Sequence, residues 1–271
     1  MTMLECFAGT FVDRDNFNRY MQETLGNSYG PQTYFIYYKD GNHKGHVELS
    51  RYRQPLSQFK CRSMCINECE QLSYVLSRDL QNLSIEDNSQ WVCLCAALSS
   101  NGPFRLEKIH VLLCTKLKNL FCLSCSLCSN IHSLQSLWLC QLESLTAIFK
   151  EDIANLIQAS PPINRFSQLK LLYISECHTI KTLLTLSLVS QLQNLEIIDV
   201  LDCNLMEQIF AVADHDDSIK ITLPELTELY LKGLPQLKTV CKEILVCKSG
   251  FELQIYDCPN LYEPRIEYVA L

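Results

Sequence analysis

The chain has 271 residues, of which 48% are apolar and 20% charged, and its formal net charge at pH 7 is −7. This negative charge excludes the basic surface that nucleic-acid-binding proteins and proteins of anionic membranes carry. No uncharged apolar run reaches the roughly 18–20 residues that a membrane span needs, and the N-terminus lacks the basic and apolar regions of a signal peptide. We therefore expect a cytoplasmic protein with no membrane span and no nucleic-acid partner.

The first 58 residues do not show the pattern that dominates the rest of the chain. Residues 15–25 are predicted to form a helix, because their apolar side chains share one face. Residues 34–38 are typical of a strand, and a turn separates them from a second extended piece near residues 46–49. We interpret residues 1–58 as a connecting or capping segment that covers the open end of the following region, residues 59–271.

From residue 59 onward, one line of sequence recurs in seven copies, the first of them degraded and the last truncated. Leu169, Leu172, Ile174 and Cys177 carry the line in its clearest form. This spacing matches the leucine-rich-repeat signature L-x-x-L-x-L-x-x-N/C, whose apolar-x-apolar centre is a short strand with alternate side chains pointing inward. The last position of the signature is occupied in chain order by Cys69, Cys114, Leu142, Cys177, Cys203, Leu234 and Cys258.

The repeats predict an α/β leucine-rich-repeat solenoid, with a curved parallel sheet on its concave face and an irregular or short helical convex side. Residues 77–103 interrupt the pattern. The longer units carry insertions at residues 151–165 and 213–220, which we expect on the side away from the strands. The second insertion contains an acidic run at residues 214–217, which we interpret as a solvated loop.

The 16 cysteines do not predict a disulfide scaffold. Five of the seven copies have Cys at a position where the other two have Leu, so this position favours a small buried apolar group. Free thiols in this number are typical of a reducing compartment, which again indicates the cytoplasm.

The cysteines of one segment have a spacing that could hold a metal. Cys122, Cys125, Cys128 and His132 are separated by two, two and three residues, as in some zinc or iron–sulfur sites. The segment connects two repeats, however, and Ser and Cys alternate in it as interchangeable small residues. We interpret it as structural and expect no metal, with a Cys/His metal-binding protein as the alternative.

The chain contains none of the local motifs that predict an enzyme. There is no Gly-x-Ser-x-Gly elbow around a nucleophile, and residues 41–45 are the nearest approach to a phosphate-binding loop. We therefore expect neither catalytic residues nor a cofactor.

A binding site is predicted on the concave face of the sheet. There, the residue between the two inward apolar positions of each repeat points outward. Aromatic rings with a polar edge are typical anchors of protein interfaces, although rings on adjacent strands also stack and stabilise a sheet, and both roles can hold. The predicted protein-binding residues are His110, Trp138, Tyr173, Asp199, Tyr230 and Gln254, with Cys65 at the equivalent position of the degraded copy.

Three stretches of the repeat region resemble one known family. Residues 166–203, 221–231 and 253–261, the last with its Asp-Cys-Pro-Asn-Leu ending, are similar to the C-terminal leucine-rich repeats of plant disease-resistance proteins. These are intracellular immune receptors with a coiled coil, a nucleotide-binding region and leucine-rich repeats. Residues 4–20 resemble the segment that joins two repeat blocks in those receptors.

The resemblance implies a protein-interaction module of plant defence. Its expected partners are a pathogen effector or a host protein that an effector modifies, and a nucleotide-binding domain of the same receptor. The chain itself shows no coiled coil or nucleotide-binding region, so ATP-dependent switching is not expected of it. The alternative is a substrate adaptor of a ubiquitin ligase, which would carry an F-box-like helical segment that residues 1–58 do not resemble.

Overall fold

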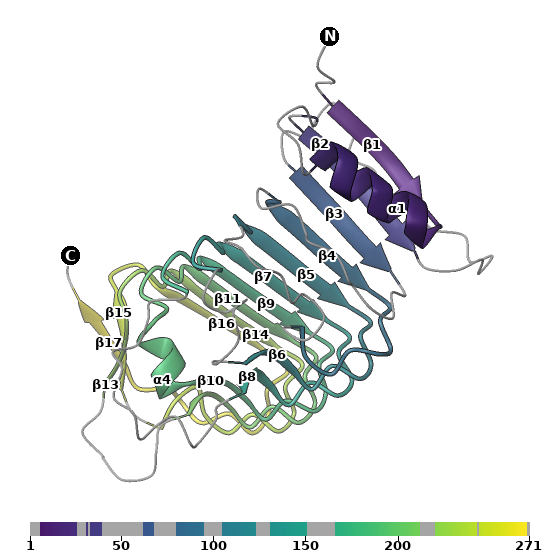
Figure 1. The fold of residues 1–271 in the computed structure, drawn as a ribbon. Coiled ribbons are helices and arrows are strands. Elements are labelled where there is room, and N and C mark those ends of the chain that lie inside the picture. Colours follow the sequence, from purple (N-terminus) through teal and green to yellow (C-terminus); the bar gives the residue numbers. More distant parts are fainter. Residues whose placement is uncertain are drawn as a thin grey trace, which may run out of the picture.

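Ten parallel strands form one sheet and follow each other across it in chain order (Figure 1). The computed structural model describes residues 6–25, 31, 33–39, 62–67, 80–94, 105–122, 131–150, 166–211, 220–242 and 244–269. The strands are β1 (Cys6–Phe11), β2 (Thr33–Lys39), β3 (Arg62–Asn67), β4 (Asn82–Glu86), β5 (Lys108–Leu112), β7 (Ser136–Cys140), β9 (Leu171–Ser175), β11 (Ile197–Leu201), β14 (Glu228–Lys232) and β16 (Glu252–Tyr256).

The core lies on one face of this sheet. In β4, β5, β7, β9, β11 and β14 the two apolar residues of each strand are at most 1% exposed, and each faces its equivalents on the neighbouring strands. Leu172 pairs in register with Leu137 and Ile198, for example. This continuous apolar ladder confirms the predicted solenoid, because every repeat buries its strand against the repeats beside it.

In the ten-stranded sheet, a residue in the left-handed conformation follows each strand from β4 to β16. In the six repeats before the edge strand β16, its backbone N–H donates to the last carbonyl oxygen of the next strand, at 2.8–3.1 Å, so it continues the ladder through the bend. Gly233 occupies this position after β14, where an added Cβ would lie 2.1 Å from Asp202 Oδ1. The seven residues, with φ between 50° and 65°, are Asp87, Leu113, Gln141, Glu176, Asp202, Gly233 and Asp257.

The cysteines of the repeats lie just after these bends. Their thiols donate to the carbonyl oxygen two residues earlier, at 3.5 Å for Cys114, 3.4 Å for Cys177 and 3.3 Å for Cys203 and Cys258. The position therefore accepts a small apolar group, and where that group is Cys its thiol adds a weak hydrogen bond that the sequence did not indicate.

The predicted interruption at residues 77–103 is wrong, because it contains β4. A further copy of the repeat is present there, with Asn88 in place of Cys. Asn88 is 1% exposed, and its Oδ1 accepts hydrogen bonds from the backbone N–H groups of Gln90 at 2.9 Å and Trp91 at 3.0 Å. The signature allows Asn as well as Cys at this position, so the signal was in the sequence. The apolar positions of this copy are Leu80, Leu83, Ile85 and Trp91, all buried.

The N-terminal segment extends the same sheet. The predicted helix is confirmed as α1 (Arg14–Tyr20) followed by the π-helical turn η1 (Met21–Leu25), and the predicted strand lies within β2. Asp13 caps α1, since its Oδ1 accepts from the N–H of Asn16 at 2.8 Å. The second extended piece, near residues 46–49, lies outside the described residues.

Two strands of residues 1–58 thus join the strands of the repeats. β2 pairs with both β1 and β3, and the ring of Phe17 in α1 stacks on Tyr38 of β2 with centroids 4.4 Å apart. A division of the chain after residue 58 stays a prediction.

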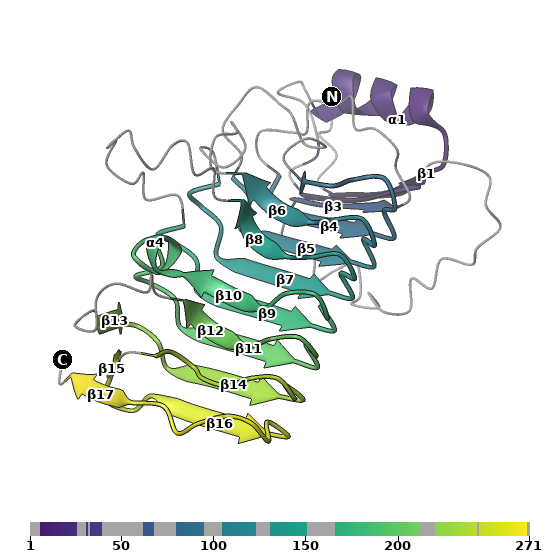
Figure 2. The same ribbon diagram turned by 90° about the horizontal axis from the view of Figure 1, so that it is seen from below.

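The returning side of the repeats consists mainly of short parallel strands (Figure 2). It is more regular than the irregular or short helical side that the sequence predicted, and its one helix among the described repeats is α4 (Leu186–Val189). The strands are β6 (Asn119–Cys122) with β8 (Ala147–Lys150), β10 (Thr182–Thr185) with β12 (Gln208–Ala211), and β13 (Lys220–Leu223) with β15 (Ile244–Lys248) and β17 (Ile266–Val269). In the described part of the chain, no helix has the length and apolar character to cross a membrane.

Candidate functional site

The six residues predicted to bind a partner lie in one register row across β5 to β16. Each is paired with the next on the adjacent strand, and all six side chains are half-buried on the face of the sheet away from the core. We call this face the open face. The central row is His110, Trp138, Tyr173, Asp199, Tyr230 and Gln254.

The row continues toward the N-terminus through two further residues. Ser84 of β4 pairs with His110 and belongs to the row; the sequence prediction missed it together with its repeat. Cys65 of β3 pairs with Ser84, so it has the predicted place in the row, but it is only 1% exposed and offers no surface to a partner. Four consecutive residues of β3 are buried, and this strand is therefore covered on both faces.

Three neighbouring rings of the central row pack against one another, and two of them are stacked. The centroids of Trp138 and Tyr173 lie 4.5 Å apart in a stacked arrangement, and those of His110 and Trp138 lie 5.5 Å apart. The indole N–H of Trp138 donates to Ser136 Oγ at 2.8 Å, which fixes the ring. Stacking on adjacent strands is therefore present, and it leaves the half-buried rings in a defined orientation on the open face.

His110 begins this group of rings as a neutral ring. Burial lowers the pKa of this imidazole, and the positive charge of Lys108 two residues earlier on β5 lowers it further. A neutral imidazole can donate from one nitrogen and accept at the other, so this end of the group offers hydrogen bonds and carries no charge.

One residue of the central row is a carboxylate, and a second carboxylate lies beside the row on β14. Asp199 lies between Tyr173 and Tyr230, and burial, followed by the negative charge of Glu228, raises the pKa of its carboxyl. Glu228 accepts a long hydrogen bond from Gln254 Nε2 at 3.5 Å. Among the described residues, no Lys or Arg forms an ion pair with Asp199 or Glu228.

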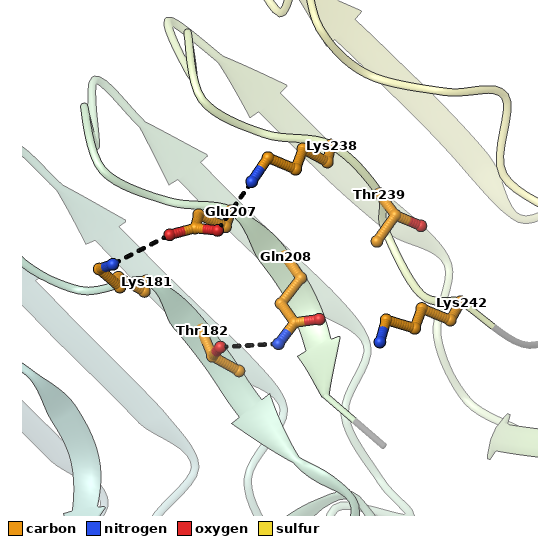
Figure 3. Close-up of a pocket in the computed structure, with 7 residues that line it drawn as sticks. All are labelled: Lys181, Thr182, Glu207, Gln208, Lys238, Thr239 and Lys242. Atoms are coloured by element: carbon orange, nitrogen blue, oxygen red, sulfur yellow. Dashed lines mark hydrogen bonds and ion pairs between the residues drawn. The ribbon is translucent and has the colours of Figure 1, made fainter. Parts of the chain in front are cut away.

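A pocket of about 390 Å³ lies on the returning side (Figure 3). Glu207 is paired there with Lys181 at 3.1 Å and with Lys238 at 2.9 Å, and hydrogen bonds from both lysines lower the pKa of its carboxyl. The amide of Gln208 donates to Thr182 Oγ1 at 3.0 Å. The residues lining this pocket are Lys181, Thr182, Glu207, Gln208, Lys238, Thr239 and Lys242.

The charges of this pocket connect three successive repeats. Lys181, Glu207 and Lys238 each follow the last apolar residue of their repeat, so alternating charge at one repeat position was a signal in the sequence. All three side chains are at least 37% exposed, so each pair contributes little stability. The pocket carries more lysines than carboxylates, and an anion is the kind of group that it could attract.

The structure leaves the possible metal motif open. Cys122 ends β6 and His132 lies in the turn before β7, but Cys125 and Cys128 lie outside the described residues, as does the acidic run at residues 214–217. Within the described ranges, no three His, Cys, Asp or Glu side chains gather as a metal site would require.

Comparison with known proteins agrees with the repeat geometry. The family model for the leucine-rich repeats of plant disease resistance protein RPS2-like matches residues 141–263, which include β8 to β16 and four residues of the central row. A probable disease resistance protein of Arabidopsis thaliana is 34% identical over 100 residues, which are 36% of this chain and 11% of that relative. No solved structure matches the chain. Residues 141–263 are therefore similar to the leucine-rich repeats of plant disease-resistance proteins.

Proposed function

We propose that this chain is the protein-interaction module of a cytoplasmic plant immune receptor and that its open face binds a pathogen effector or a host protein modified by one. The observation that carries the proposal is the central row: six half-buried side chains, three of them rings that pack together, held in register on a sheet face away from the core. The family likeness supports a role in disease resistance.

The physics of the row supports binding rather than catalysis. Trp138 and Tyr173 are already ordered by stacking, so a partner that covers them loses little side-chain entropy on association. Large rings with polar edges are the side chains that contribute most at protein interfaces. The row contains no nucleophile paired with a base, which is what covalent catalysis would need.

Two further parts of the proposal concern the compartment and a partner within the same receptor. Nine cysteines of the described part are free thiols, which supports a reducing compartment such as the cytoplasm. A nucleotide-binding domain of the same receptor is proposed as an intramolecular partner, because the disease-resistance type of repeat is found in proteins that combine the two.

The test compares proteins captured by variants of the whole chain from infected plant tissue. The double variant Trp138→Ala, Tyr173→Ala should lose the captured effector or host protein. The matched control Tyr262→Ala removes a ring that is 75% exposed and lies outside the central row, and it should retain the captured protein. Circular dichroism establishes that each variant is folded.

A second variant keeps the test decisive if the double variant does not fold. Glu252→Arg reverses the charge of an exposed side chain on the open face, next to the central row, and should also weaken capture. Equal capture by Glu252→Arg, the Tyr262→Ala control and the unmodified chain would show that the partner binds elsewhere.

A further inference from the structure

The most unusual environment on the open face surrounds Asp199. Its strand, β11, lies between β9 and β14, and its direct neighbours in the register are Tyr173 on one side and Tyr230 on the other (Figure 1). Adjacent parallel strands are about 4.8 Å apart, so the backbones of both tyrosines lie one strand spacing from the backbone of Asp199. The ring of Tyr173 packs on Trp138 and the ring of Tyr230 packs on Tyr256, with centroids 4.5 and 5.5 Å apart. An acidic side chain flanked in the register by two aromatic residues is an arrangement that suits a cation.

A second and a third carboxylate extend the negative charge of this region. Glu228 lies on β14, close enough to Asp199 for their charges to interact, and Glu252 pairs with Glu228 on β16. Like charges on neighbouring strands destabilise a sheet, and sheets commonly place opposite charges there. Repulsion between these carboxylates therefore lowers the stability of the free chain, and a positively charged partner would relieve it.

The described cations near this region do not neutralise these carboxylates. Lys170, which precedes β9, is paired with Glu196 at 2.8 Å. Lys232 lies on the same face of β14 as Glu228 and is exposed, but among the described residues it forms no ion pair with Asp199 or Glu228. Asp199 is half-buried and has no ion pair to a described Lys or Arg. The missing counter-charge would therefore come from another protein.

We propose that Tyr173, Asp199, Glu228 and Tyr230 form a subsite for one arginine side chain of the protein that binds the open face. The planar guanidinium stacks on the tyrosine rings, and its N–H groups donate to the two carboxylates. A lysine ammonium fits the charge but lacks the flat surface that stacks on a ring, so arginine is preferred. This inference rests on the proposed function, because it specifies the chemistry of the partner at the same face.

The test uses a capped hexa-arginine peptide as the probe, with binding to the whole chain measured by calorimetry at low salt. Asp199→Asn removes the charge without changing the shape of the side chain. We expect the dissociation constant to rise about fivefold or more, as an ion pair combined with cation–π contacts implies. Hexa-lysine should bind more weakly than hexa-arginine to the unmodified chain.

Asp202→Asn is the matched control. Asp202 is exposed, lies three residues farther along the chain, and has the left-handed conformation that Asn also adopts. This control should change the dissociation constant less than twofold. Equal weakening by both substitutions would show general attraction to an acidic protein and overturn the subsite. Failure of the unmodified chain to bind hexa-arginine would overturn it as well.

A second pair of variants tests the rings. Tyr230→Phe keeps the ring face and should preserve binding of the peptide, whereas Tyr230→Leu should weaken it severalfold. Equal affinities of these two variants would contradict stacking of the guanidinium. The carboxyl pKa of Asp199, followed by NMR, should fall when the peptide binds, and an unchanged pKa would place the peptide elsewhere.

The outcomes separate this inference from the proposed function. If capture of a plant or pathogen protein requires Trp138 but Asp199→Asn leaves peptide binding unchanged, the open face binds proteins and the arginine subsite is wrong. If Asp199→Asn weakens peptide binding but capture is independent of Trp138 and Glu252, the subsite is a cation site and the proposed function is wrong.

Discussion

Cys177 and Cys203 occupy the same position in adjacent repeats, and each thiol donates to the carbonyl oxygen two residues before it, Ser175 at 3.4 Å and Leu201 at 3.3 Å. Neither side chain is exposed to solvent. Each of the two residues thus has the same role in its own repeat: a small buried donor that stabilises the bend at the end of a strand. Their thiols are held as structural groups rather than as reactive ones.

This environment predicts resistance to alkylation. Burial raises the pKa of the Cys203 thiol to about 12, so at pH 8 almost none of it is the thiolate that reacts. In the folded chain, Cys203 should remain unmodified by iodoacetamide while the same residue in guanidinium chloride is alkylated fully, as followed by peptide mass spectrometry. Labelling at similar rates in both conditions would contradict the buried position.

The apolar ladder predicts the effect of a buried charge. Leu172 is 1% exposed and in register with Leu137 and Ile198, so Leu172→Asp places a carboxylate where no partner can pair with it. We expect the free energy of unfolding to fall by about 4 kcal/mol or more, and several repeats to lose structure together, since each stabilises the next. Thermal melting followed by circular dichroism measures this loss.

The control for this substitution is Tyr262→Asp, at a side chain that is 75% exposed. It should change the melting temperature little, because surface substitutions outside special environments have small effects. A melting curve for Leu172→Asp that coincides with that of the control would mean that the register of the ladder is wrong.

The raised pKa of Asp199 predicts that replacing this residue with Asn stabilises the folded chain. Because its pKa is raised in the folded chain, folding makes this carboxyl harder to ionise. Stability is therefore lost as the pH rises from the ordinary pKa of aspartate through the raised folded pKa, and it stays lower above that value. Asp199→Asn should melt at a higher temperature than the unmodified chain at pH 7, and the difference should shrink toward pH 4.

Asp202→Asn again provides the comparison for this measurement, since its exposed carboxyl lies away from the rings and the buried face. It should show no gain at pH 7. If Asp199→Asn instead melted at a lower temperature than the unmodified chain, the carboxylate would stabilise the free folded chain. That result would contradict the inference that Asp199 lacks a favourable counter-charge.

The spacing of apolar residues was sufficient to predict the sheet strands of the repeats, apart from β4, and the row of outward residues, apart from Ser84. In Leu172, Tyr173 and Ile174, alternation alone decides which side chain is buried, because a strand sends successive residues to opposite faces. The same logic placed His110, Trp138, Asp199, Tyr230 and Gln254 on the open face, where the structure has them. Whether these residues bind a protein stays a prediction.

The features that the sequence analysis did not predict depend on contacts between strands or on polar side chains that the apolar pattern does not register. Alternation directs Cys65 outward, but its burial arises from groups that cover β3, and these are distant from the pattern of the strand itself. Asn88 was missed because its role depends on hydrogen bonds to two backbone N–H groups, not on apolarity. The pairing of Glu207 with two lysines required knowing which repeats are neighbours.

The central row has a consequence for how such a chain can diversify. Its six side chains project from strands whose buried residues lie on the opposite face of the sheet. Replacing Tyr230 with another polar or aromatic residue would therefore change the open face and leave the core residues Leu229 and Leu231 unchanged. Under the proposed function, recognition and folding are encoded at alternate positions of the same five-residue strands. Under that proposal, single substitutions in the row can change which partner binds, one repeat at a time. A duplicated repeat would add one position to the row without disturbing the repeats already present.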